Sequence, residues 1–431
     1  MGGQVSRVAA GMSLAHFQGL LGIAALLLFA WALSEDRKVR PSWRWIGGAL
    51  LLQLVLALVI LRVPFVWRLM GYANEGVRAI ERATLEGSSY MFGYLGGAEL
   101  PFALRDGVDA PVIIAFQILP LVIVFSALAA VLWHWGVLHW LVRGLSFMLR
   151  RTLGVSGVVG LAGGANIFLG VVESPLAIRA YFAKMSRAEL FAVMVLAMST
   201  ISGAILILYA QTLSETVPDA VGHMISASLI SLPAALLIAK IMVPGEGTTE
   251  EDRDEPGLRY EGTIDAIIRG TMDGLQLFLA VIAVIIVIFA LVALADQILA
   301  VLPLVGGEEL SVKRLFGWLF APVMWLIGVP WGQAVDAGAL MGTKSILNEY
   351  VAYLELAALD AGTFDPRSLL IVTYALCGVA NLASIGLLVS TIGTLCPERR
   401  AEAAGLGVKS WIAGNAATLM TGAMVGLVTF G

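Results

Sequence analysis

Long apolar segments recur along the whole chain and predict a bundle of membrane-spanning helices. Each segment reaches roughly 20 residues, the length that an α-helix needs to cross the hydrocarbon core of a bilayer. Residues 64–110 instead mix charged and apolar positions, which predicts an amphipathic helix at the membrane surface followed by a glycine-rich loop. The predicted fold class is therefore all-α integral membrane, with about eight transmembrane helices. The apolar segments cover residues 14–33, 43–63, 111–135, 188–210, 222–243, 264–303, 368–395 and 408–430.

Two further apolar stretches, 155–186 and 327–358, are interrupted by glycine and polar residues and predict two re-entrant helical hairpins. Their legs are about a dozen residues long, too short to cross a bilayer. Basic residues flank the first stretch, whereas the loops 211–221 and 354–366 contain no lysine or arginine. The positive-inside rule then places the ends of the first hairpin in the cytoplasm, and the ends of the second hairpin and both chain termini outside.

The two halves of the chain resemble each other weakly and predict inverted repeats. Gly170 precedes Tyr181 by the same spacing that separates Gly342 from Tyr353, and an alanine precedes each tyrosine. Each hairpin is followed by a helix with a small, polar break. Inverted repeats with broken helices are typical of secondary transporters. The predicted domains are scaffold helices with the interfacial helix (1–135), transport repeat 1 (136–243), an acidic loop with a scaffold helix (244–310) and transport repeat 2 (311–431).

Composition argues against several other classes of protein. The 431 residues are 59% hydrophobic and 13% charged, whereas soluble domains carry about 25% charged residues. The net charge is −4 and no basic stripe with interleaved aromatic residues is present, so nucleic acid is not an expected partner. The two cysteines and four histidines are not spaced as a metal site, and no nucleophile motif supports an enzyme. No cofactor is expected; a membrane-embedded enzyme or a channel is the competing class.

The middle of the first hairpin contains an acidic candidate residue. Glu173 follows Val171 and Val172 and precedes Ser174-Pro175, a pair that predicts an N-cap and the first residue of a half-helix. A carboxylate at membrane depth is costly and usually functional, which makes Glu173 a candidate substrate ligand. A structural acid at the hairpin tip is the alternative.

The second hairpin and the later break contain further candidate substrate ligands. Asn348 and Glu349 follow the second tip, where a carboxylate can accept hydrogen bonds from sugar hydroxyls or base N–H groups. A purely structural pair between Lys344 and Glu349 is the alternative. Asn381 and Ser384 are three residues apart in the break at 378–384, hence on one helix face, and could contact the same ligand.

Neutral oxygens near the first hairpin predict a sodium site. Asn166 lies before Gly170, and Thr200 lies before Ile201 in the break at 199–203, where backbone carbonyls should be freed. Such oxygens are typical of a sodium site in a discontinuous helix. Simple hydrogen bonding between helices is the alternative.

Three motifs resemble those of the concentrative nucleoside transporter family, over roughly residues 110–431. GTKSILNEYVAY at 342–353 is similar to the family's G-x-K-x3-N-E-[FY]-x-A-Y signature. CGVANLASI at 377–385 resembles its C-G-F-A-N-x-x-S-I stretch. NIFLGVVESPL at 166–176 resembles N-x3-G-Q-T-E-A-P-L, with Val171-Val172 in place of Gln-Thr. Losing two polar groups there predicts an altered base selectivity.

The resemblance implies a role for each candidate residue. Glu349, Asn381 and Ser384 would hold the ribose, and Glu173 would face the nucleobase. The sodium ligands would be Asn166, Thr200 and the backbone carbonyls of Leu169 and Ile201.

The resemblance also implies an assembly and a mechanism. The protein would be a homotrimer surrounded by lipid in the cell inner membrane, crossing it several times. It would import nucleosides by sodium symport, through an elevator-like movement of the two repeats. A proton-coupled importer of nucleosides or nucleoside analogues, with Glu173 or Glu349 as the proton carrier, is the alternative.

Overall fold

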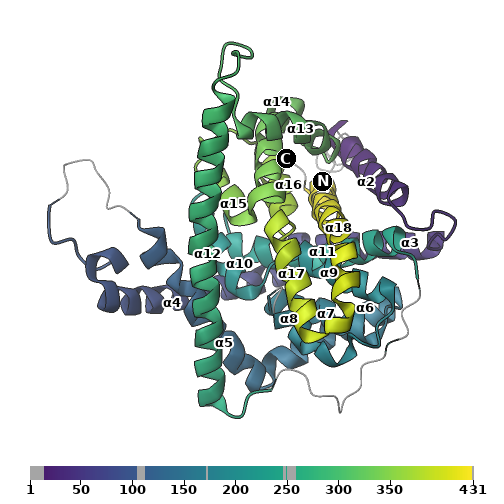
Figure 1. Ribbon diagram of the computed structural model, residues 1–431, viewed down its shortest axis with the longest axis horizontal. Helices are drawn as coiled ribbons and strands as arrows, with labels where there is room; N and C mark the ends of the chain where they lie inside the picture. Colours follow the sequence, from purple (N-terminus) through teal and green to yellow (C-terminus); the bar gives the residue numbers. More distant parts are fainter. Residues whose placement is uncertain (1–13, 104–111, 171–172, 246–248, 250–258, 430–431) are drawn as a thin grey trace, which may run out of the picture.

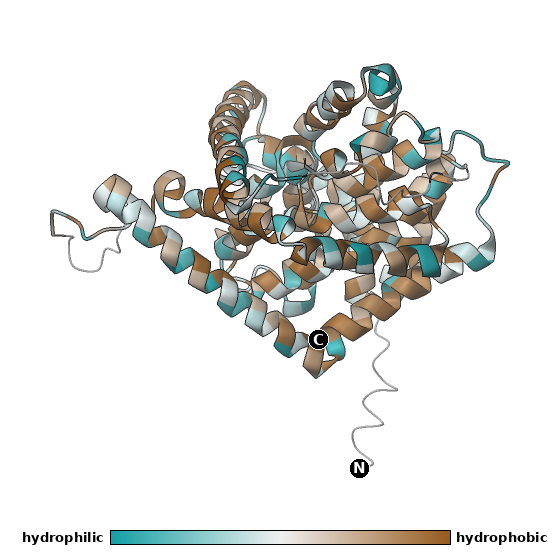
Figure 2. Ribbon diagram, turned by 90° about the horizontal axis from the view of Figure 1, so that it is seen from below, coloured by the Kyte–Doolittle hydropathy of each residue, from teal (hydrophilic) through white to brown (hydrophobic). Residues whose placement is uncertain are grey.

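The computed structural model describes residues 14–103, 112–170, 173–245, 249 and 259–429, which form helices and connecting loops without a β-strand (Figure 1). In these residues six helical segments are long and apolar enough to cross a membrane. Many large apolar side chains are exposed, as expected for contact with lipid. Figure 2 shows hydrophobic residues along most of the ribbon. The predicted all-α membrane fold is confirmed, with six spanning segments in the described residues where about eight were predicted, because the run 368–395 is split into two shorter helices and the apolar helix at the N-terminal end is shorter than a full span. The six segments are Trp43–Arg62, Ile114–His134, Arg187–Thr212, Ala220–Met242, Thr263–Leu299 and Pro397–Val428.

The predicted interfacial helix is α4 (Pro64–Phe92), which begins at a proline. Proline suits the first turn of a helix because its missing N–H would be unpaired there anyway. Large apolar side chains such as Phe65 and Tyr72 are exposed on α4. Figure 1 shows that α4 runs outward from the side of the bundle.

The same order of elements occurs twice, as the sequence repeat predicted: a helix, a hairpin, a broken helix and a final long helix. The first hairpin leg is 12 residues long, and so is the leg that opens the second hairpin. Repeat 1 contains α6 (Val137–Leu153), α7 (Gly157–Phe168), α8 (Glu173–Ala177), α9 (Arg187–Ser199), α10 (Gly203–Thr212) and α11 (Ala220–Met242). Repeat 2 contains α13 (Val312–Leu326), α14 (Trp331–Gly342), the π-helical turn η4 (Thr343–Leu347), α15 (Glu349–Ala357), α16 (Pro366–Leu376), α17 (Leu382–Leu395) and α18 (Arg400–Val428).

Both predicted helix breaks are present, and each ends at a capping side chain. The first break separates α9 from α10, and Ser202 accepts a hydrogen bond from the Ile205 N–H. The second separates α16 from α17, and Asn381 accepts from the Ser384 N–H at 2.8 Å. A capping oxygen stabilises the start of a new helix because the first backbone N–H groups have no partner within it.

The two breaks meet at the centre of the bundle. A Cβ atom placed on Gly378 would lie 3.1 Å from the carbonyl oxygen of Met198, and one on Gly414 would lie 2.6 Å from the Met198 side chain. These glycines therefore allow α9, α18 and the second break to approach closely. The close approach of the two breaks brings the candidate residues of both repeats near one another.

Two further groups of helices surround this centre. The helix α12 (Thr263–Leu299) packs along α5 (Pro120–His134), where Gly270 and Gly274 allow close approach, and its remaining surface is mostly exposed (Figure 1). The helices α2 (Leu14–Ala32) and α3 (Trp43–Arg62) pack mainly against α18 and α11.

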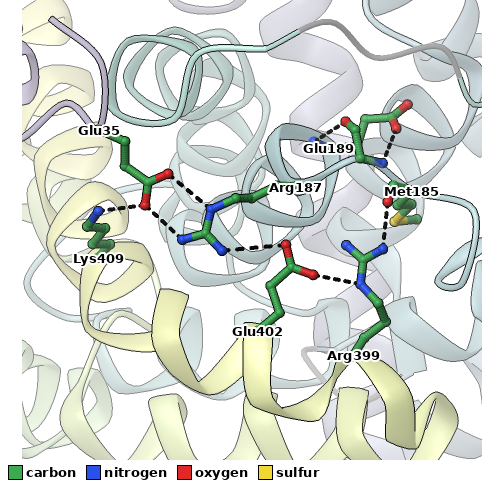
Figure 3. A network of polar contacts seen from close by, with 8 residues as sticks. Glu35, Met185, Arg187, Glu189, Arg399, Glu402 and Lys409 are labelled. Carbon is green, nitrogen blue, oxygen red and sulfur yellow. Dashed lines mark hydrogen bonds and ion pairs between the residues drawn. The ribbon is translucent and has the colours of Figure 1, made fainter.

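An ion-pair network ties the loop between α2 and α3 to the two repeats (Figure 3). Glu35 accepts hydrogen bonds from Arg187 at 2.8 Å and from Lys409 at 2.6 Å. Glu402 lies between Arg187 and Arg399. The hydrogen bond from Arg187, joined by Lys409, lowers the pKa of Glu35 from 4.5 to about 2.

Candidate substrate and ion site

The second hairpin places Glu349 at the start of a half-helix. The turn η4 ends at Leu347, and the side-chain oxygen of the next residue, Asn348, accepts a hydrogen bond from the Tyr350 N–H at 2.7 Å and so caps α15. Glu349 is the first residue of α15 and is 3% exposed. A helix N-terminus favours a negative charge at this position. The predicted candidate Asn348 thus has its side-chain oxygen engaged in the cap.

Both carboxylate oxygens of Glu349 accept hydrogen bonds from other elements. The Tyr209 hydroxyl donates to one oxygen at 2.6 Å, and the side-chain amide of Asn381 donates to the other at 2.7 Å. Asn381 also caps α17 by accepting from the Ser384 N–H, so hydrogen bonds join Glu349 to Asn381 and Asn381 to the backbone of Ser384. A carboxylate has about four lone-pair sites, so acceptor capacity remains for ligand hydroxyls.

Lys344 does not pair with Glu349, contrary to the structural alternative. Its ammonium group is fully buried and donates to Asn415 at 2.8 Å and to Thr418 at 3.0 Å, both on α18. The side-chain amide of Asn415 in turn donates to the carbonyl of Ala380 in the second break. The Lys344 side chain therefore ties the second hairpin to α18, and leaves the Glu349 oxygens to Tyr209 and Asn381.

The first hairpin and the first break bring together Asn166 and Thr200, two of the predicted sodium ligands. The Asn166 amide donates to the Leu196 carbonyl at 2.9 Å and to the Thr200 hydroxyl. In the described part of the chain, no hydrogen bond is donated to the carbonyl of Leu169 or of Ile201, the two freed carbonyls that were predicted. Neutral oxygens of this kind are suitable ligands for a hard cation.

The predicted cap at Ser174 is wrong. The helix α8 already begins at Glu173, and the Ser174 hydroxyl donates to the side-chain oxygen of Asn166 at 2.9 Å. Ser174 is itself buried, and a buried polar group without a partner is costly, so its hydroxyl bonds to the Asn166 oxygen. Ser174 therefore belongs to the Asn166 cluster.

The centre of the first hairpin lies partly outside the described residues. Val171 and Val172 fall in the gap at 171–172, and of Glu173 only the backbone is described, as the start of α8. The candidate base contacts of these three residues stay predictions.

Sequence reasoning missed three polar partners. Tyr209 on α10 holds Glu349, and Asn415 and Thr418 on α18 hold Lys344. All three are polar residues within otherwise apolar helices, which is a signal for a buried interaction. What the sequence does not reveal is the partner, because 140 residues separate Tyr209 from Glu349.

Family models match most of the chain. Models described as the N-terminus and the C-terminus of Na+ dependent nucleoside transporters match residues 21–95 and 223–426, and a nucleoside recognition (Gate) model matches residues 115–216. The chain is 34% identical to the uncharacterized transporter YutK of Bacillus subtilis over 95% of its own length and 98% of that protein. It is 31% identical to the nucleoside permease NupC of Helicobacter pylori over 95% and 96% of the two lengths.

The chain belongs to the concentrative, Na+-dependent nucleoside transporter family. It is similar to CNTnw in an inward-facing substrate-bound state, with a TM-score of 0.83, 34% identity, and coverage of 96% of this chain and 98% of that one. It is also similar to a CNTnw variant in an outward-facing state, with a TM-score of 0.85, 33% identity, and coverage of 96% and 97%. This nucleoside transporter thus shares the fold of proteins solved in inward-facing and in outward-facing states. The family contains transporters and permeases, not enzymes.

Proposed function

We propose that this nucleoside transporter imports nucleosides by sodium symport, with Glu349 as the central substrate ligand. The observation that carries the proposal is the buried Glu349 carboxylate, which is fixed by Tyr209 and Asn381 at the meeting point of the two repeats. A buried carboxylate with spare acceptor capacity suits the adjacent hydroxyls of a ribose. Ser384, with its backbone N–H bound to Asn381, is the proposed second ribose contact.

The proposed sodium ligands are Asn166, Thr200 and the carbonyls of Leu169 and Ile201. Their support is the cluster of neutral oxygens at the first break, together with the description of the family as sodium-dependent. A proton carrier needs no such cluster, which favours sodium over protons as the coupling ion. No further cofactor is proposed.

The proposed movement is elevator-like. The two repeats, residues 136–243 and 311–431, would carry the site across the membrane relative to a frame that contains α5 and α12. The relatives solved in inward-facing and outward-facing states support such a movement. The exposed apolar surface of α12 suits contact with lipid and with two further copies in a homotrimer. The proposed location is the cell inner membrane.

Base selectivity is the part of the proposal that differs from the family pattern. Val171-Val172 stands where the family motif has Gln-Thr, so the base side has lost two hydrogen-bonding groups. A site without these groups discriminates less between bases that differ in their polar edges. We therefore expect uridine and adenosine to be accepted with similar preference, or a nucleoside with another base to be preferred.

Uptake into proteoliposomes tests this function. Labelled uridine and adenosine are offered with and without an inward sodium gradient, and again with a protonophore. Accumulation that requires the sodium gradient and resists the protonophore is the expected result. Accumulation that persists without sodium and disappears with the protonophore would show that protons are the coupling ion.

A further inference from the structure

Tyr209 links the two halves of the site. It lies on α10, which begins directly after the break that contains Thr200, and its hydroxyl donates to Glu349 on the second hairpin. The side chain is 2% exposed. A single short helix thus connects the proposed ion ligands at one end with the proposed substrate ligand at the other.

The start of α10 is packed against the first hairpin. A Cβ atom placed on Gly203 would lie 3.2 Å from the carbonyl oxygen of Phe168 and 3.1 Å from the Phe125 ring. Ser202 caps the helix just before this contact. A shift of the break or of the hairpin end therefore moves the start of α10, because the Phe168 carbonyl and the Phe125 ring lie directly against Gly203.

The far end of α10 is packed against the second hairpin. The Tyr209 ring stacks on Tyr350 at 5.6 Å between ring centroids and contacts Tyr353 at 5.0 Å. Figure 1 shows α10 beside α15, the helix that contains both partners and Glu349. From Gly203 to Tyr209 the helix rises only about 9 Å at 1.5 Å per residue, so the segment behaves as a stiff rod.

We propose that Tyr209 couples ion binding to nucleoside binding by transmitting the position of the first break to the Glu349 carboxylate. This inference rests on the proposed sodium-coupled function. An ion held by Asn166, Thr200 and the freed carbonyls fixes the start of α10 and thereby the Tyr209 hydroxyl. The hydroxyl then donates to one oxygen of the Glu349 carboxylate while the Asn381 amide donates to the other, and together they fix the orientation of the carboxylate. Without the ion the break can shift, and the carboxylate loses one of its two donors.

The coupling has a measurable consequence in both directions. If sodium tightens nucleoside binding by some factor, the nucleoside must tighten sodium binding by the same factor, since both report one coupling free energy. Tyr209 acts here as a positioning residue. Removing its hydroxyl should reduce that factor while leaving the ion ligands themselves in place.

The test compares Tyr209→Phe with Tyr353→Phe. Tyr353 is equally buried and contacts the Tyr209 ring, but its hydroxyl donates to the carbonyl of Thr373 and not to Glu349. The dissociation constant of uridine or adenosine is measured by calorimetry in sodium and in choline. The dissociation constant of sodium is measured with and without the nucleoside. Each variant thus loses one hydroxyl from the same aromatic cluster.

Wild type and Tyr353→Phe are expected to show a sodium effect on nucleoside affinity of at least roughly fivefold, the lower end of typical couplings. For Tyr209→Phe the sodium effect on nucleoside affinity should fall towards a factor of one. Its sodium affinity measured without nucleoside should stay within about twofold of the wild-type value, a change well below a typical coupling. Unchanged sodium binding also shows that the variant is folded.

Two results would overturn the coupling role. One is that Tyr209→Phe weakens nucleoside binding equally in sodium and in choline, which makes Tyr209 only an anchor for the substrate ligand. The other is that Tyr353→Phe abolishes the factor as well, which makes the whole tyrosine cluster responsible. A wild-type protein with no sodium effect at all would instead contradict the proposed sodium coupling, and the coupling role with it.

Discussion

The side-chain amide of Asn381 donates to the Glu349 carboxylate across 2.7 Å and thereby joins the second helix break to the second hairpin. The same side chain uses its oxygen to cap α17. One residue thus builds the helix that follows the break and orients the proposed substrate ligand. These two roles can be separated by substitution.

Asn381→Ala should lose both roles, whereas Asn381→Ser should lose mainly the second. Serine is a good N-cap but has no amide that reaches Glu349, so Asn381→Ser should retain about 1 kcal/mol of stability that Asn381→Ala loses. Both variants should lose nucleoside uptake in proteoliposomes. Thermal unfolding in detergent measures the first difference, and wild-type uptake by Asn381→Ser would show that the amide is dispensable.

The buried ammonium of Lys344 predicts an asymmetry between two variants. Asn415→Leu removes one of the two acceptors of the buried ammonium group and leaves only Thr418, which should cost roughly 3 kcal/mol or more of the free energy of unfolding, because a desolvated charge loses a hydrogen bond. Lys344→Met removes the charge itself and leaves only neutral groups unpaired, at a cost of roughly 1–3 kcal/mol. Denaturation in the same detergent compares the two. A larger loss for Lys344→Met would contradict the assigned contacts at 2.8 Å and 3.0 Å.

The sequence was sufficient for the architecture because its signals are local. Apolar runs of bilayer length, the broken stretches and the small polar residues at 199–203 and 378–384 each report a feature of one segment. Both breaks formed where predicted, since Ser202 and Asn381 cap the helices that follow. The motifs likewise identified the family correctly.

The contacts within the site could not be predicted in the same way, because most of them join distant segments. A pair between Lys344 and Glu349 was the alternative that their sequence distance suggested, yet the ammonium group of Lys344 donates to Asn415. Ser174 was expected to cap a helix, yet it binds Asn166 across the hairpin. The buried partner of Lys344 lies on α18 and that of Ser174 lies eight residues earlier in the same hairpin, and both contacts form because burial makes an unsatisfied polar group costly.

The ion pairs of Glu35 predict a pH-dependent stability. Because the folded-state pKa is about 2 and the ordinary value is 4.5, the contribution is fully present above pH 4.5 and is lost as the pH falls towards 2. Glu35 is partly exposed, so the contribution should not exceed about 1 kcal/mol. Melting temperatures of wild type and Glu35→Gln should therefore differ at pH 7 and converge below pH 4.5. A constant difference down to pH 3 would contradict the ion-pair origin, as would insensitivity to salt.

The role of Glu349 is tested most directly by nucleoside binding to the purified protein. Glu349→Gln places an amide where Tyr209 and Asn381 both donate, so one donor loses its acceptor. Glu355→Gln is the matched control, since Glu355 lies on the same helix and contacts Thr343 instead. The measurement is calorimetry with uridine and adenosine in saturating sodium.

Glu349→Gln is predicted to bind about 10- to 150-fold more weakly than wild type, the equivalent of roughly 1.5–3 kcal/mol for a hydrogen bond to a charged group. Glu355→Gln should bind as wild type does. Equal binding by wild type and Glu349→Gln would contradict the assignment of this carboxylate as the central nucleoside ligand.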